Sequence, residues 1–180
     1  MWRAIALVLL AAVVIFAVVV ARQPADFAIQ RTIVVQAPPS VIYPHIAGPR
    51  AMNEWSPFAL GDPQMKIEYS GPETGVDAKS AWDSKQMGAG SMTYTEAKPD
   101  QEVAMRLDFE RPMKATNTAR ISLEPAGSTT RVTWRMEGHN GFVGKAFALV
   151  MNMDKVVGGE FEKGLLELKQ KAEAEAAGSS

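Results

Sequence analysis

The stretch VAMRLDF at residues 103–109 decides the fold, because a large apolar side chain occupies every second position. Successive side chains of a β-strand point to opposite faces, so these apolar side chains gather on one face. They are Val103, Met105, Leu107 and Phe109. The same period of two recurs in residues 65–70, 78–83, 92–95, 119–123 and 132–136. This pattern is typical of an antiparallel sheet with one buried and one solvated face.

Turn-forming residues separate the predicted strands. They are Gly71-Pro72, residues 88–90, Pro99-Asp100 and residues 125–128. Such short connections predict strands that are consecutive antiparallel neighbours. Residues 27–36 are rich in β-branched side chains and predict a further strand at the start of the domain. Two short helices, limited by prolines, are predicted between this strand and the next. One apolar face of the sheet then still lacks an element to cover it.

A helical period from residue 142 to residue 172 supplies that cover. Apolar side chains recur there at steps of three and four, at Phe142, Ala146, Leu149, Met153, Val157, Phe161, Leu165, Leu168 and Ala172. The stripe predicts a single long amphipathic helix across the sheet. Gly158, Gly159 and Gly164 weaken a helix locally, so we expect close packing or a bend around them. Residues 173–180 are small and polar and are expected to form a flexible tail.

The N-terminal segment has a different character. Residues 4–21 contain no charge and no amide side chain, and such a run covers most of a bilayer core. Trp2, Arg3 and Arg22 suit the two interfaces. The division predicted is a transmembrane anchor at 1–22, a linker at 23–26 and a domain at 27–172. A cleaved signal peptide ending near Ala21, with a secreted or periplasmic product, is the alternative. The arginines leave the orientation open.

Composition excludes several classes of function. The formal net charge is −1 and the basic residues are scattered, which disfavours nucleic-acid binding. The chain contains no cysteine, so disulfides, zinc–thiolate sites and thiol nucleophiles are excluded. His45 and His139 lie far apart without metal-ligand spacing or a catalytic triad. The sequence therefore predicts no metal, no cofactor and no identifiable catalytic residue, and it leaves the oligomeric state open.

Several short motifs carry a family resemblance. They are Trp55-Ser56-Pro57, Asp62-Pro63, Tyr69-Ser70-Gly71-Pro72 with Gly75, Trp82, Gly88-x-Gly90, Thr130-x-Val132-x-Trp134, Gly138-His139-Asn140, residues 151–155 and residues 161–165. With them the chain resembles the bacterial SRPBCC family, in its polyketide cyclase/dehydrase and lipid-transport-like group. The resemblance implies an α+β helix-grip (START-like) fold, an antiparallel sheet wrapped on a long C-terminal helix. The resemblance implies a Gly-Asn turn after Trp82, but the sequence has Asp83-Ser84-Lys85 there. The shape of that hairpin is therefore not predicted.

The predicted site is a hydrophobic cavity between sheet and helix. Methionines form a pliable lining for apolar ligands, and inward polar groups can orient a ligand head. The candidate residues are Tyr69, Ser80, Trp82, Met92, Tyr94, Met105, Trp134 and Met153. The leading hypothesis is a membrane-tethered binding domain for a hydrophobic small molecule or lipid. A cyclase- or dehydratase-like enzyme and a ligand-free interaction or stress-response domain with a filled core are the alternatives.

Overall fold

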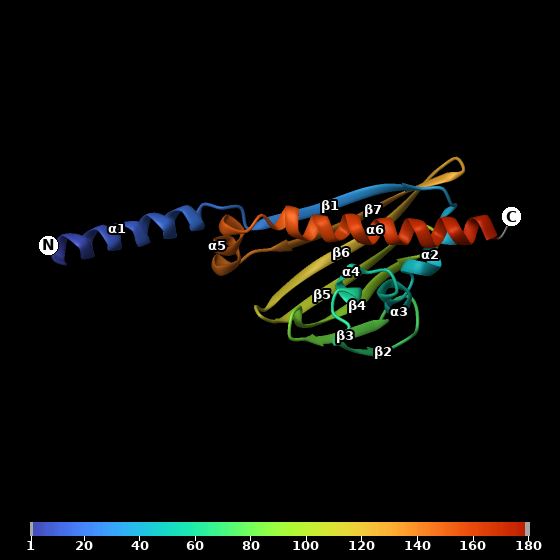
Figure 1. Cartoon of the computed structure of the whole chain (residues 1–180), viewed down its shortest axis with the longest axis horizontal. Coiled ribbons are helices and arrows are strands. Elements are labelled where there is room, and N and C mark those ends of the chain that lie inside the picture. Colours follow the sequence, from blue (N-terminus) through green and yellow to red (C-terminus); the bar gives the residue numbers. More distant parts are fainter. Residues whose placement is uncertain (1, 179–180) are drawn as a thin grey trace.

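One seven-stranded sheet organises the domain. A computed structural model of the chain, which describes residues 2–178, places the strands in the order β1-β7-β6-β5-β4-β3-β2, with every neighbouring pair antiparallel (Figure 1). The strands are β1 (Asp26–Val35), β2 (Lys66–Ser70), β3 (Lys79–Ser84), β4 (Gly88–Lys98), β5 (Glu102–Arg111), β6 (Ala115–Ala126) and β7 (Thr129–His139). The predicted consecutive strands are thus confirmed, and β1 completes the sheet beside β7.

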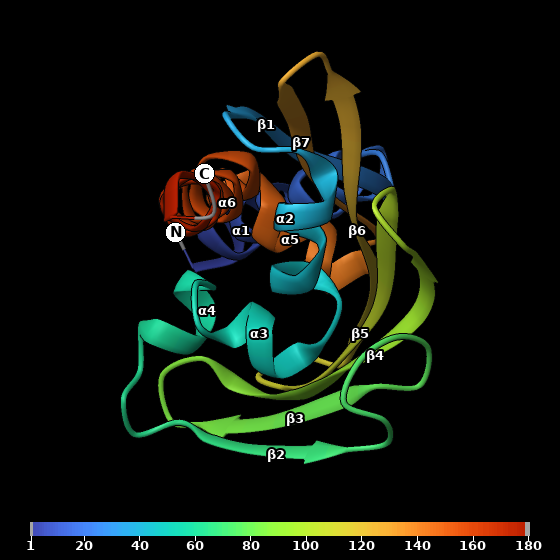
Figure 2. The ribbon, with the colours of Figure 1, turned by 90° about the vertical axis from the view of Figure 1, so that its right-hand side faces the viewer.

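Helices occupy both ends of the chain and one long connection. They are α1 (Trp2–Ala21), α2 (Pro39–Ile46), α3 (Pro49–Asn53), α4 (Pro57–Leu60), α5 (Phe142–Val150) and α6 (Met153–Gly178). The helices α2, α3 and α4 each begin with a proline at the first helical position, where no backbone donor is needed. The sheet curves around α2, α3 and α6 (Figure 2). The α+β helix-grip fold predicted from the sequence is confirmed.

The α6 helix supplies the cover over the sheet. It packs chiefly on β1, and further contacts reach α2, α4 and β7. Its buried face consists of Gly158, Phe161, Gly164, Leu165, Leu168 and Ala172. These residues follow the predicted steps of three and four, so the second half of the apolar stripe is correct.

The first half of the stripe belongs to a separate helix, so the prediction of one continuous helix is wrong. α5 ends at Val150, and Met151 is extended. The side-chain oxygen of Asn152 accepts a hydrogen bond from the backbone N–H of Lys155 at 2.9 Å, which caps the new helix α6. Residues 173–178, expected to be a flexible tail, continue α6. Ser179 and Ser180 lie outside the described residues.

Two glycines of α6 allow the close packing that the sequence predicted. A Cβ atom on Gly158 would overlap the guanidinium of Arg31. A Cβ atom on Gly164 would lie 2.9 Å from Trp134 and 2.8 Å from Pro57. These approaches are closer than real contacts allow, so a side chain at position 158 would displace the Arg31 guanidinium, and the helix needs glycine at position 164 against the rigid rings.

The turn after Trp82, left open by the sequence, is built around Ser84. The Ser84 hydroxyl accepts hydrogen bonds from the backbone N–H groups of Gln86 and Met87, at 3.0 and 2.8 Å. It donates to Asp62 at 2.6 Å and thereby lowers the pKa of that carboxyl. The serine thus ties the β3–β4 hairpin to the loop that follows α4.

The α1 helix leaves the domain as an isolated, apolar rod (Figure 1). By length and composition it can cross a membrane, a property that N-terminal signal sequences share. Val20 is its buried residue, and its other described side chains are partly or fully exposed. The helix packs against α5.

Candidate functional site

The interior between sheet and helices is closed at the α2 end. Tyr94 on β4 is fully buried, and its hydroxyl donates to the backbone carbonyl of Ile46 at 3.0 Å. The thioether of Met52 lies at 3.6 Å from the same hydroxyl. Burial raises the pKa of Tyr94 far above its usual range. The hydroxyl expected to orient a ligand is therefore already used to join β4 to α2.

An aromatic cluster fills the middle of the interior. Trp134 of β7 stacks on Phe161 of α6, with ring centroids 4.2 Å apart and planes 7° apart. Trp55 meets Trp134 edge-on at 5.3 Å, and Phe58 of α4 meets both stacked rings edge-on. The Trp55 Nε1 donates to the carbonyl of His45 at 2.9 Å. This cluster joins sheet, α6 and the short helices into one core.

Trp134 nevertheless keeps one polar group unused. Its Nε1 is buried and has no hydrogen-bond partner among the described residues 2–178. Gly164 lies against Cζ3, on the six-membered ring and at the far side of the indole from Nε1. Buried donors in native proteins are nearly always paired, so an orphaned one calls for an acceptor.

Side chains at the opposite end of the interior are less completely buried. Along β5, Val103 and Met105 are buried, whereas Leu107 and Phe109 on the same face are partly exposed. Trp82 of β3 meets Phe109 edge-on at 5.7 Å. Trp82 crosses above Gly90, where a Cβ atom would lie 2.6 Å from its ring. We call Trp82, Leu107 and Phe109 the aromatic mouth, since their apolar side chains are half-covered.

The predicted lining residues therefore divide into two groups. Those buried in the packed interior are Ser80, Met92, Tyr94, Met105 and Trp134. Those that remain partly exposed are Tyr69, Trp82 and Met153. The structure places Trp82 in the aromatic mouth and Trp134 in the central cluster, and their part in ligand binding stays a prediction.

Tyr69 lies in a different setting from the one predicted. Its hydroxyl accepts a hydrogen bond from the side-chain amide of Asn53 at 3.0 Å. The guanidinium carbon of Arg50 lies 4.1 Å from its ring centroid. These contacts place Tyr69 beneath α3, beside a shallow depression of about 340 Å³ that Arg50 and Lys79 also line. Its polar group serves the α3–β2 contact.

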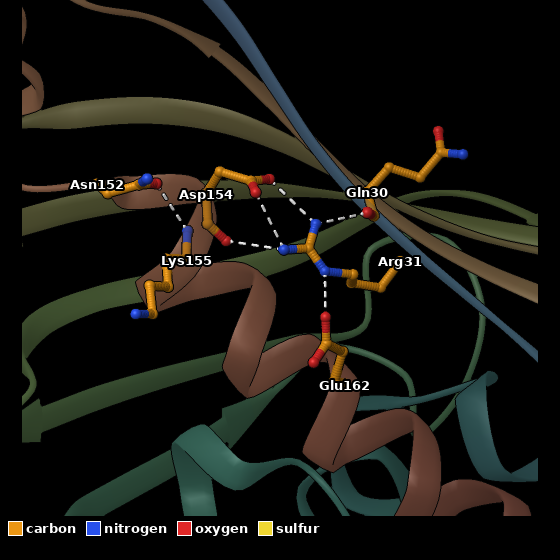
Figure 3. Close-up of polar contacts among 6 residues, drawn as sticks. All are labelled: Gln30, Arg31, Asn152, Asp154, Lys155 and Glu162. Carbon is orange, nitrogen blue, oxygen red and sulfur yellow. Dashed lines mark hydrogen bonds and ion pairs between the residues drawn. The ribbon is translucent and has the colours of Figure 1, made fainter.

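An arginine that the sequence reasoning passed over holds the beginning of α6. Arg31 of β1 is bound by Asp154 and Glu162 from two turns of α6 (Figure 3). Its Nη1 lies 3.0 Å from Asp154 Oδ1, and its Nη2 donates to the Asp154 backbone carbonyl at 3.0 Å. Arg31 lowers the pKa of the Asp154 carboxyl. We call Arg31, Asp154 and Glu162 the arginine clamp.

The sequence contains a signal for this clamp. Residues 27–35 alternate, and their inward positions are Phe27, Ile29, Arg31, Ile33 and Val35. An arginine among inward apolar residues needs an acidic partner, because an unpaired charge is costly to bury. Asp154 on the surface of α6 is that partner, and its side chain is 63% exposed.

The histidines stand apart from the interior. His45 lies 2.9 Å from Glu175, and His139 lies 2.8 Å from Asp26 on the outer surface. Within residues 2–178, no group of three or more His, Asp or Glu side chains is arranged to hold a metal ion. The described interior offers apolar contacts and one unpaired indole donor, and the two histidine–carboxylate pairs lie outside it.

A curved antiparallel sheet closed around a C-terminal helix defines the helix-grip class of proteins. The chain belongs to the polyketide cyclase/dehydrase and lipid transport family, whose model matches residues 26–173. No curated protein matches the sequence.

Solved structures share the fold at low sequence identity. Protein CV1439 from Chromobacterium violaceum is 17% identical with a TM-score of 0.60, covering 81% of this chain and 96% of that one. The Aha1 dimer from Colwellia psychrerythraea is also 17% identical, with a TM-score of 0.58 and coverage of 82% and 96%. DynU16, a putative protein in the dynemicin biosynthetic locus, is 14% identical with a TM-score of 0.57, covering 83% of this chain and 48% of that chain.

Proposed function

We propose that the protein is a membrane-tethered binding domain that takes a lipid-like or other apolar small molecule into the sheet–helix interior. The family description supports an apolar ligand. The α1 helix supports the tether, since its length and composition suit a membrane span. The aromatic mouth is the route of entry, because its apolar side chains are only half-covered. The unpaired Trp134 Nε1 is the observation that carries the proposal, since an acceptor on the ligand would satisfy it.

Entry requires the interior to widen, and the beginning of α6 is the element suited to move. The first large apolar side chain of α6 that is buried is Phe161. Ahead of it, Met153 and Val157 are only partly buried, and the arginine clamp supplies the polar contacts to β1. Ion pairs near the surface are worth less than buried apolar contacts. The first turns of α6 can therefore separate from β1 while the rest of the helix stays packed.

A photoreactive fatty acid carrying a diazirine on its chain tests the proposal in the full-length protein. The protein is reconstituted in lipid nanodiscs, irradiated with the probe, digested, and mapped by mass spectrometry. We expect adducts on the peptides that carry Trp82, Phe109 and Trp134, in competition with unlabelled fatty acid. Adducts confined to α1 and α5 would contradict an interior site.

Two tryptophan variants sharpen this experiment. Trp134→Phe removes the free donor and keeps an aromatic ring on Phe161, so we expect interior labelling to fall by about five-fold, the equivalent of ~1 kcal/mol. Trp55→Phe removes a donor that already serves His45, so it should lower stability and leave labelling of the folded protein unchanged. Equal labelling of wild type and Trp134→Phe would remove the indole from the site.

The packed aromatic cluster favours a second candidate, a ligand-free interaction domain. Trp134, Phe161 and Trp55 already contact one another without a ligand. Native mass spectrometry of protein extracted from its own membrane separates the two candidates. A co-purifying apolar molecule favours the binding domain, whereas bare protein together with absent interior labelling favours the interaction domain.

A further inference from the structure

The α5 helix exposes an apolar face that the domain does not cover. Val143, Phe147 and Val150 follow steps of four and three, and they are 64%, 47% and 83% exposed. Phe142, Leu149 and Met151 beside them are also exposed. Lys145 is the single charged residue of this helix. A contiguous exposed apolar surface of this kind indicates an interaction site.

The position of α5 identifies what covers this face. α5 packs against α1 at the end where α1 enters the domain (Figure 1). Val20, in the last turn of α1, is fully buried, and Lys145 Nζ donates to the carbonyl of Ala21 at 3.5 Å. The 20 residues of α1 extend over about 30 Å, which is the thickness of the hydrocarbon core. A membrane crossed by α1 thus has its surface at the level of α5.

We propose that α5 is an interfacial helix that lies on the bilayer surface beside α1, with Val143, Phe147 and Val150 in the lipid. This inference rests on the tether of the proposed function and adds a second membrane contact to it. Interfacial helices bury an apolar face at the boundary between headgroups and acyl chains and keep their polar side chains in the headgroup layer. The amine of Lys145 lies at the C-terminal end of α1, where a cation compensates the last carbonyl groups.

A lipid surface fits this face better than a second copy of the chain. The apolar face adjoins a helix whose exposed side chains are themselves apolar and whose length suits a membrane span. Covering α5 with protein would leave a gap in the lipid contact next to α1. Docking of α5 also fixes the tilt of the domain, so that the end from which α5 and α6 begin stays against the membrane.

Single-cysteine spin labelling tests the proposal on the full chain, because the chain contains no cysteine of its own. Val143→Cys and Val150→Cys carry a nitroxide on the proposed lipid face. Val13→Cys in α1 is the reference for lipid. Val34→Cys in β1 is the matched control, an exposed valine in the domain at the far end of β1. The proteins are reconstituted in nanodiscs of phosphatidylcholine and phosphatidylglycerol, and the accessibility of each label to oxygen and to a water-soluble nickel complex is measured.

We expect the oxygen-to-nickel accessibility ratio at Val143→Cys and Val150→Cys to lie clearly above the Val34→Cys value and between it and the Val13→Cys value, as for a site at the headgroup–acyl boundary. A ratio equal to that of Val34→Cys, with Val13→Cys in lipid, overturns the docking of α5 and leaves the tether intact. A water-like value at Val13→Cys overturns the tether and the docking together. Low access to both reagents with dipolar broadening between labels would assign the face to a second copy, which also overturns the proposal.

Discussion

Two aromatic side chains in the same interior differ in whether their polar group makes a hydrogen bond. Tyr94 gives its hydroxyl to Ile46, whereas Trp134 keeps its indole N–H free of partners among residues 2–178. The alternation of the sequence placed both rings on the buried face of the sheet. Alternation predicts the face of a side chain but not its hydrogen-bond partner. The role in ligand binding expected for Tyr94 therefore passes to Trp134 in the proposed function.

Substitution of Tyr94 tests its structural role. Tyr94→Phe leaves the carbonyl of Ile46 without its donor, so we expect a loss of about 1–3 kcal/mol in the free energy of unfolding. Urea denaturation measures this loss, and interior labelling by the fatty-acid probe should not change. Tyr43→Phe, at a partly exposed tyrosine, is the control. A stable Tyr94→Phe protein with weakened labelling would restore Tyr94 to the ligand site.

The arginine clamp makes the attachment of α6 depend on pH. Arg31 lowers the pKa of Asp154 below 3.8 in the folded protein, so the contribution of this ion pair is complete above that value. It is lost as the pH falls through the lowered pKa. We expect wild type to be more stable than Asp154→Asn at pH 7, and the difference to shrink below about pH 4. Urea midpoints across this range measure it, and a difference that does not shrink at all between pH 5 and pH 3 would mean that the charge is not its cause.

At the scale of elements, the glycines of α6 have different tasks. Gly164 lies against Trp134 and Pro57, so Gly164→Ala forces the helix away from the aromatic cluster and should destabilise the protein by about 1–3 kcal/mol. A Cβ atom on Gly159 would meet no other atom of the described residues within 4 Å, so Gly159→Ala should stabilise the helix by roughly 0.5–1 kcal/mol. Thermal unfolding of both variants measures the contrast. Equal effects would show that α6 does not press on the sheet at Gly164.

Phe161 is the side chain by which α6 grips the aromatic cluster. Phe161→Ala removes the ring stacked on Trp134 and leaves a cavity, so we expect a loss of about 3–5 kcal/mol in the free energy of unfolding. Leu166→Ala, at an exposed position of the same helix, is the control and should change stability little. An unchanged urea midpoint for Phe161→Ala would contradict the packing of α6 described above.

The break between α5 and α6 shows where the sequence pattern loses information. Leu149 and Met153 are four residues apart, so the apolar period continues in phase across the break. The spacing of apolar residues indicates which side chains lie on the same face of a helix. It does not indicate whether one helix ends and another begins with a different axis. Asn152 followed by Asp154 is an N-terminal capping signal, and it could have located the start of α6.

For the whole molecule, the sequence predicts the fold far better than the state of its interior. Period-two and helical patterns are local, and they indicate the strands, their hairpins and the covering helix. The pairing of β1 with β7 joins segments about 100 residues apart in the chain, so a local pattern does not assign it. Met92 and Met105 fit a cavity wall and a packed core equally well, so only the three-dimensional structure could place them in packed surroundings.

The domain should fold without α1. Val20 is the residue of α1 that is buried against the rest of the chain, so a fragment of residues 25–177 retains the sheet and the α6 contacts. We expect its near-ultraviolet circular dichroism and urea midpoint to match those of the full chain in detergent. Faster hydrogen exchange should be confined to α5, which loses its packing on Val20. A fragment obtained only as aggregate would contradict a modular tether.

The short connection between α1 and β1 limits where the domain can go. Residues 22–25 reach at most about 14 Å when fully extended, and the carbonyl of Ala25 is already bonded to the N–H of Asn140 at 2.7 Å. While α1 remains attached and in a membrane, this connection is far too short to let the domain cross an aqueous compartment with a bound ligand. Under the proposed function, the domain therefore diffuses within the plane of its own bilayer and exchanges its ligand there.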